Sequence, residues 1–204
     1  MARYEIQYGH LERPRHTNLD EDKARFECAV QKWLDISETG FGVALLNDCK
    51  YGAHAGMETV TLTLMKSGTH PDPRGDEGTR FVTYSLLPHA CAFSAESVIH
   101  PAYELNAPVR VVPGEVGAAP LLSYDRPNVI VESVKWAELE SAFVARVYEA
   151  EKTGSFAEIQ FATPVKSVVE TNLLEEKPKP VRLRDGKIQF YIRPFEIKTF
   201  VCRV

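Results

Sequence analysis

The chain has 204 residues, of which 44% are hydrophobic and 25% are charged, as in an ordinary globular protein with a large core. Its formal net charge of −4 argues against a general nucleic-acid binder, because contacts to phosphates require a concentrated basic face. No apolar run approaches the roughly 20 residues of a membrane helix, and the N-terminus lacks the apolar core of a signal peptide. We therefore expect a cytoplasmic protein that binds neither nucleic acid nor a membrane.

The opening alternation of Arg3–Tyr8 predicts a short strand, and the polar residues Gly9–Asn18 predict a loop after it. Arg25–Ile36 is a second extended candidate, in which Trp33 is expected to anchor the segment by burial.

The apolar run Phe41–Leu46 predicts a buried strand, and it ends abruptly in a polar group. Asn47 and Asp48 can bond their own backbone and fix a turn, which leaves Lys50 and Tyr51 to point outward. Two interpretations stay open for this turn. It is either a structural hairpin turn or a contact with a molecule outside the chain.

Glu58–Lys66 alternates between apolar and threonine positions, which predicts an antiparallel strand with one wet face. The residues Ser67–Gly78 are rich in Pro, Gly and Asp and predict a loop, and Phe81–Leu87 predicts a further strand that ends at Pro88. Ser94 can then cap a short helix that Pro101 bends or shortens.

The second half of the chain follows a linker-like Gly/Pro/Ala stretch at 113–120. Strands are predicted at hairpin spacing at Val129–Val134, Phe143–Glu149, Ala157–Phe161, Lys166–Thr171, Val181–Arg184, Lys187–Ile192 and Glu196–Arg203. The Asp185-Gly186 pair suits a type I′ turn. Glu175 and Glu176 are expected to face solvent, and Trp136 is expected to be an anchor.

These elements predict an all-β fold of antiparallel β-sandwich architecture, with two packed β units and one short helix. The expected boundaries are a β-sandwich at 1–113, a linker at 114–127 and a terminal small β-sandwich at 128–204. Among catalytic motifs, the sequence has no GxGxxG, P-loop, GxSxG or HExxH pattern.

Candidate metal ligands are scattered. The cysteines lie far apart and form no CxxC pair, so all four are expected to be reduced: Cys28, Cys49, Cys91 and Cys202. The histidines lack the spacing of a metal motif. For the loop that holds His10 and His16 this favours a docking surface for another part of a larger protein, and for His89 and His100 it favours a hydrogen-bonded structural role. We predict no metal or cofactor in this chain.

Several segments carry a resemblance to a known family. They are Tyr8–Pro14, Gln31–Asp35, Gly42–Gly52 and Phe81–His89, followed by Val131–Lys135, Arg146–Ala150 and Phe195–Arg203. They resemble the C-terminal region of glycoside hydrolase family 38 α-mannosidases, of the cytosolic neutral type. The run Leu-Leu-Asn-Asp-Cys-Lys-Tyr-Gly is the most specific piece, and the resemblance covers nearly the whole chain.

The resemblance implies an enzyme that removes terminal α-linked mannose from oligosaccharides with retention. An aspartate nucleophile and a divalent metal, zinc or cobalt, are supplied in the family by an N-terminal α/β barrel whose motifs have no counterpart here. The implied partners are that missing catalytic module and, through the full enzyme, a mannose-containing oligosaccharide. A homo-oligomer stays open, and this chain alone is expected to be inactive.

In secreted members of the family, an Asp-Arg pair occupies the turn that matches Asn47 to Lys50. The resemblance therefore puts Lys50 in place of the arginine, and we expect Asn47, Asp48, Lys50 and Tyr51 to complete the substrate pocket of the full enzyme. Two other functions compete with this one. They are an autonomous carbohydrate-binding module, which a row of exposed aromatic residues would favour, and a structural assembly domain.

Overall fold

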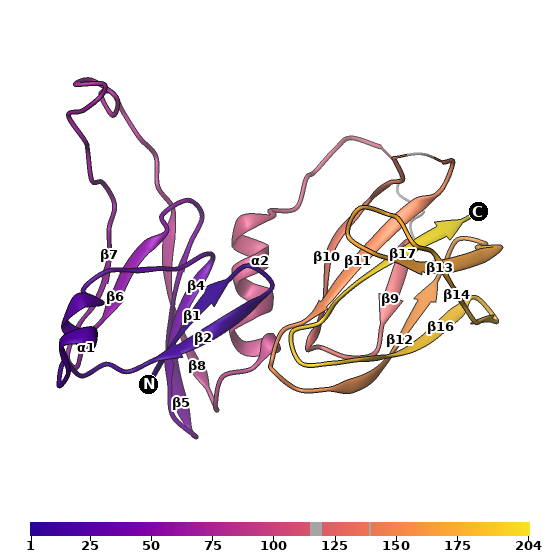
Figure 1. Cartoon of the computed structure of the whole chain (residues 1–204), viewed down its shortest axis with the longest axis horizontal. Coiled ribbons are helices and arrows are strands. Elements are labelled where there is room, and N and C mark those ends of the chain that lie inside the picture. The colour runs from indigo at the N-terminus through magenta and orange to yellow at the C-terminus, as the bar shows by residue number, and fades with distance from the viewer. Residues whose placement is uncertain (115–119, 139) are drawn as a thin grey trace. The chain divides into compact units, whose positions relative to one another are not determined.

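The computed structural model describes residues 1–114, 120–138 and 140–204, and the chain divides into two compact units, Met1–Arg110 and Val111–Val204. Figure 1 shows that strands dominate both units. All strand pairs among the described residues are antiparallel. The predicted all-β class with antiparallel sheets is therefore confirmed.

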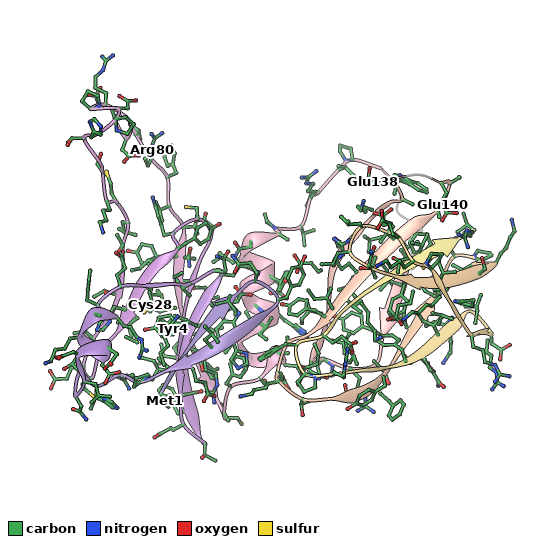
Figure 2. All side chains as sticks on the ribbon, viewed as in Figure 1. Met1, Tyr4, Cys28, Arg80, Glu138 and Glu140 are labelled. Atoms are coloured by element: carbon green, nitrogen blue, oxygen red, sulfur yellow. The ribbon has the colours of Figure 1, made fainter. Side chains whose placement is uncertain are left out.

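The first unit pairs a five-stranded sheet with a three-stranded one. The larger sheet has the order β2-β1-β4-β5-β8, formed by Gly9–Arg13, Ala2–Ile6, Trp33–Ser37, Phe41–Asn47 and Tyr84–Ala90. The smaller has the order β3-β6-β7, formed by Cys28–Ala29, Gly52–Ala55 and Val60–Leu62. Tyr4 and Leu34 pack with Cys28 and Ala53 in one core cluster, and the Ala55 amide donates to the Tyr4 hydroxyl at 2.9 Å. Figure 2 labels Tyr4 and Cys28 within this unit.

The helical elements of the described residues all lie in the first unit. They are α1 (Asp20–Ala24), a π-helical turn at Ala95–Ile99 and α2 (His100–Asn106). Ser94 caps the π-helical turn by accepting from the Ser97 amide, and Pro101 lies in the first turn of α2, as the sequence predicts. The short α1 was not predicted. It is capped from within, because the Asp22 carboxylate accepts the Leu19 amide at 3.2 Å. No helix in the described residues is long and apolar enough to cross a bilayer.

The second unit is a β-sandwich. One sheet has the order β10-β11-β17-β13-β14, formed by Val129–Trp136, Phe143–Glu149, Ile197–Arg203, Ser167–Thr171 and Lys179–Val181. The other has the order β15-β16-β12-β9, formed by Leu183–Arg184, Lys187–Ile192, Ser155–Phe161 and Leu122–Tyr124. Inward side chains of both sheets, such as Val147, Ile159, Ile188 and Phe200, form one core.

Turn chemistry in the second unit follows the prediction. Asp185 and Gly186 have φ values of 49° and 73°, which are the positive values of a type I′ turn between β15 and β16. The strands Phe143–Glu149 and Lys187–Ile192 begin and end where the alternation of the sequence puts them.

Three predictions in the first unit are wrong in part. The predicted loop at Gly9–Asn18 begins with strand β2, because Tyr8 adopts a φ of 58° and closes a hairpin with β1. Of the predicted strand Glu58–Lys66, only Val60–Leu62 pairs, and it lies at the edge of its sheet. Strand β8 begins at Tyr84 and runs through Pro88, because β8 pairs with β5 alone and an edge strand tolerates proline.

Three predictions in the second unit also need correction. The linker expected at 114–127 falls partly outside the described residues, and its residues Leu122–Tyr124 form β9 on β12. The Glu175 side chain is only 8% exposed and pairs with Lys135 at 2.6 Å, so it does not face solvent. Trp136, expected to be an anchor, is 74% exposed at the end of the edge strand β10.

Candidate functional site

The segment Asp48–Tyr51 is a crossover between two sheets and not the hairpin turn that the sequence also allowed. Strand β5 already pairs with β4 on one side and β8 on the other, so no place beside it is left for the next strand. Strand β6 pairs instead with β3 and β7 in the smaller sheet. The crossover therefore lies at the ends of both sheets, where side chains can reach out.

Asn47 fixes the start of the crossover. Its side chain is buried, with the residue 1% exposed, and its amide nitrogen donates to the Gln31 carbonyl at 2.8 Å. Its side-chain oxygen accepts the Lys50 amide at 2.7 Å, so Asn47 bonds the backbone of the crossover as the sequence predicts. The Asn47 carbonyl accepts from Asn106 of α2 at 3.0 Å. Asn47 thus positions the neighbouring residues through hydrogen bonds to the protein itself.

Asp48 joins the crossover by hydrogen bonds to Thr83, the residue that precedes β8. Its amide donates to the Thr83 carbonyl, and its carboxylate accepts the Thr83 amide, both at 3.1 Å. Hydrogen bonds from the Cys49 side chain and from Thr83 lower the pKa of Asp48. The same carboxylate raises the pKa of the exposed Cys49 thiol, which disfavours a reactive thiolate.

Lys50 is the residue of the crossover whose side chain lies at a cavity. It lines an open cavity of about 530 Å³, and no hydrogen bond or ion pair engages its ammonium group among the described residues. Tyr51 is 52% exposed and does not line this cavity. Of the four predicted site residues, Asn47 and Asp48 hold the backbone of the crossover by hydrogen bonds. Lys50 lines the cavity, and Tyr51 is exposed outside the cavity lining.

The cavity combines charged, aromatic and apolar side chains. Besides Lys50, it is lined by Glu27, Gly52, Thr63, Leu64, Met65, Lys66, Asp76, Arg80, Val82 and Tyr84. Figure 1 shows the segment between β7 and β8 reaching away from the sheets of the first unit, and Figure 2 labels Arg80 on it. The carboxylates in this lining can accept hydrogen bonds from hydroxyl groups, and its lysine and arginine side chains can donate hydrogen bonds to them. Together with the 57% exposed Tyr84 ring, they suit a ligand rich in hydroxyl groups.

Sequence reasoning missed most of these lining residues. Glu27 precedes β3, and Arg80 and Tyr84 come from the far end of the β7–β8 segment. The pairing of β3 with β6 brings Glu27 near the crossover, and the pairing of β5 with β8 and the Asp48–Thr83 hydrogen bonds bring Tyr84 there. No short motif records such a juxtaposition.

The buried histidines and cysteines of the described residues occupy structural positions. His10 packs against Trp33 and Phe93, and His89 bonds Asp35 at 2.9 Å. All four cysteines are free, and burial raises the pKa of Cys202 to about 12. Across the described ranges, no group of three or more His, Cys, Asp or Glu side chains is arranged to hold a metal ion.

Two protein-family descriptions match this chain, one in each unit. Residues 1–74 match the description "Glycosyl hydrolases family 38 C-terminal domain". Residues 128–200 match "Glycosyl hydrolases family 38 C-terminal beta sandwich domain". The second description agrees with the sandwich seen in that unit.

Individual relatives agree with the families. The chain is 39% identical to alpha-mannosidase 2C1 of Homo sapiens, over 96% of this chain and 20% of that protein. It is 39% identical to alpha-mannosidase G of Dictyostelium discoideum, over 98% of this chain and 19% of that protein, and 32% identical to an alpha-mannosidase of Saccharomyces cerevisiae, over 98% and 21%. The chain therefore spans about a fifth of the length of the curated relatives it matches.

A solved structure supports the fold. A glycosyl hydrolase family 38 protein from Enterococcus faecalis superposes with a TM-score of 0.72 at 19% identity, over 98% of this chain and 24% of that one. At this identity the likeness concerns the fold alone. The two family matches and the relatives show that the chain belongs to the C-terminal β region of glycoside hydrolase family 38.

Proposed function

We propose that this chain is the non-catalytic β region of an α-mannosidase that hydrolyses terminal α-linked mannose from oligosaccharides with retention. The observation that carries the proposal is the match to proteins named alpha-mannosidase, over nearly all of this chain but only a fifth of theirs. The remaining polypeptide would supply the reaction, including the nucleophile and the divalent metal, zinc or cobalt. The resemblance to the cytosolic branch supports a cytoplasmic enzyme.

Within that enzyme, the crossover contributes the positively charged Lys50 side chain to the substrate pocket. Asn47 and Asp48 hold the backbone in place through the bonds described above, and the unpaired Lys50 ammonium is presented at the rim of the cavity. An ammonium group donates to sugar hydroxyls as a point charge and lacks the two-pronged fork of arginine. Tyr51, exposed beside it, would extend the contact.

Replacing Lys50 by alanine in the full-length enzyme is expected to lower kcat/KM for an aryl α-mannoside about tenfold or more, because a charged donor to the substrate is lost. Lys50→Arg keeps the charge and should retain most of the activity. Lys23→Ala is the matched control, since Lys23 is an exposed lysine of α1 that pairs with Asp20 and lies outside the cavity lining. An unchanged kcat/KM for Lys50→Ala would remove the crossover from the substrate pocket.

One pair of exposed aromatic residues bears on the alternative of a carbohydrate-binding module. On the second unit, Phe156 of β12 and Tyr191 of β16 are 72% and 48% exposed, and their rings lie 5.2 Å apart. The rings meet edge to face, at 61°, so they form no flat platform for a sugar. Calorimetry of the chain with mannosides separates the two functions. Binding that Phe156→Ala abolishes would support the module, and absence of binding fits the proposal above.

A further inference from the structure

The larger sheet of the first unit is covered over only part of one face. A row of side chains crosses four adjacent strands of this sheet, because Tyr4 is opposite Leu34, Leu34 is opposite Leu45, and Leu45 is opposite Leu86. Their exposed fractions are 2%, 1%, 9% and 67% in that order. The face is therefore sealed at β1 and β4 and open at β8.

The smaller sheet explains this gradient. Tyr4 and Leu34 pack against Cys28, Ala53 and Ala55 of the smaller sheet, and Leu86 has no place in that cluster. Three short strands are too narrow to cover five, so within the first unit as described the smaller sheet leaves the apolar face of β5 and β8 uncovered.

The uncovered part forms an apolar groove of about 400 Å³. Its lining includes the less exposed Ile36, Val43 and Leu45 and the more exposed Phe41, Val60 and Leu86, of which the last three are 53%, 40% and 67% exposed. Arg15, Ser37 and Glu38 supply polar groups to the same lining. An apolar centre with polar groups around it is the usual composition of a protein–protein contact, and a water-exposed patch of this kind is costly in an isolated domain.

We infer that this groove, here called the open face, is the docking surface for polypeptide that precedes residue 1 in the full-length enzyme. The inference rests on the proposed function and specifies where the missing module binds. Both family descriptions are C-terminal, and the relatives are about five times longer than this chain, so a large module precedes it in the full-length enzyme.

A neighbouring segment extends the apolar surface. The residues between β7 and β8, which Figure 1 shows projecting from the first unit, expose Leu64, Met65 and Phe81 to 45%, 65% and 92%. Val60 and Leu86 of the open face lie in the two strands that this segment joins. Exposed apolar side chains at the two ends of this otherwise polar segment add to the apolar area that a permanently held module of the same polypeptide would cover.

Cysteine labelling of the full-length enzyme tests the inference. Leu86→Cys is compared with Phe156→Cys, because both parent side chains are about equally exposed in this chain, at 67% and 72%. Maleimide incorporation is followed at each peptide by mass spectrometry, so the native exposed thiols do not interfere. We expect labelling at position 86 to be at least about tenfold slower than at position 156 in the native enzyme, since a buried position reacts only after local opening. The two rates should become equal in denaturant.

The labelling rates at positions 86 and 156 have three distinguishable outcomes. Equal rates at the two positions in the native enzyme would overturn the docking surface. Protection at position 86 that disappears on dilution would assign the open face to a second copy of the enzyme and would also overturn it. Protection that is independent of concentration supports it. Hydrolysis of an α-mannoside by the same preparation reports separately on the proposed function, so an active enzyme with a reactive position 86 would refute the docking surface alone.

Discussion

Replacing Glu149 by alanine is expected to destabilise the second unit by about 3 to 5 kcal/mol, because it removes a buried carboxylate that three donors need. Glu149 ends β11 and is 0% exposed. Its two oxygens accept from the Asn128 side-chain amide at 3.0 Å, the Glu151 amide at 2.7 Å and the Phe195 amide at 3.0 Å. These bonds tie the entry to β10, the end of β11 and the turn before β17 at one point.

The measurement is denaturant unfolding of the chain followed by circular dichroism. Glu149→Gln keeps the shape and one acceptor oxygen, so its midpoint should lie between those of the wild type and Glu149→Ala. Glu158→Ala is the matched control in the same unit, because Glu158 bonds Lys187 and Gln189 at a solvent-accessible position and its loss should leave the midpoint nearly unchanged. An unfolding midpoint for Glu149→Ala equal to that for Glu158→Ala would contradict the prediction that the buried Glu149 carboxylate stabilises the second unit.

Replacing Gly42 by alanine is expected to destabilise the first unit by about 3 kcal/mol, because the new methyl group collides with His89, whose ring is hydrogen-bonded to the buried Asp35. A Cβ at position 42 would meet the His89 ring and would lie 2.7 Å from the Ser37 Cβ. The His89 ring bonds Asp35, which is 0% exposed and also accepts from the Ser37 hydroxyl at 2.8 Å. Displacing His89 leaves the buried carboxylate with fewer partners.

The chain supplies its own control for this effect. Gly40→Ala is the same substitution two residues earlier, where a Cβ meets nothing within 4 Å, so its unfolding midpoint should stay close to that of the wild type. In the double variant Gly42→Ala/His89→Ala the methyl group occupies vacated space, so the combined loss should be smaller than the sum of the two single losses. Equal midpoints for Gly42→Ala and Gly40→Ala would show that the strand relaxes without disturbing the pair.

The second unit could be predicted well from sequence because its strands are half-buried and joined by short turns. Ile188, Phe190 and Ile192 alternate with exposed residues, and the Asp185-Gly186 turn sets the register of β16 against β15. Such local signals need no knowledge of distant residues. Trp136 was misplaced because hydrophobicity alone does not show that a strand lies at an edge.

The first unit was harder to predict because its decisive contacts join distant parts of the chain. The residue type of Asn47 predicted that its side chain bonds nearby backbone, as it does by accepting the Lys50 amide. The sequence did not predict that the partner strand of β5 continues through Pro88. The cavity beside Lys50 depends on Arg80 and Tyr84, which follow a long segment of irregular structure. Periodicity within a strand cannot record where such a segment returns.

The most direct test of the account measures release of mannose from an aryl α-mannoside by the purified 204-residue chain and by the full-length enzyme at equal molar concentration. Because the chain spans only about a fifth of its α-mannosidase relatives and belongs to the C-terminal β region of the family, the account predicts hydrolysis by the full-length enzyme alone. Hydrolysis by the isolated chain, lost on heat unfolding, would contradict it.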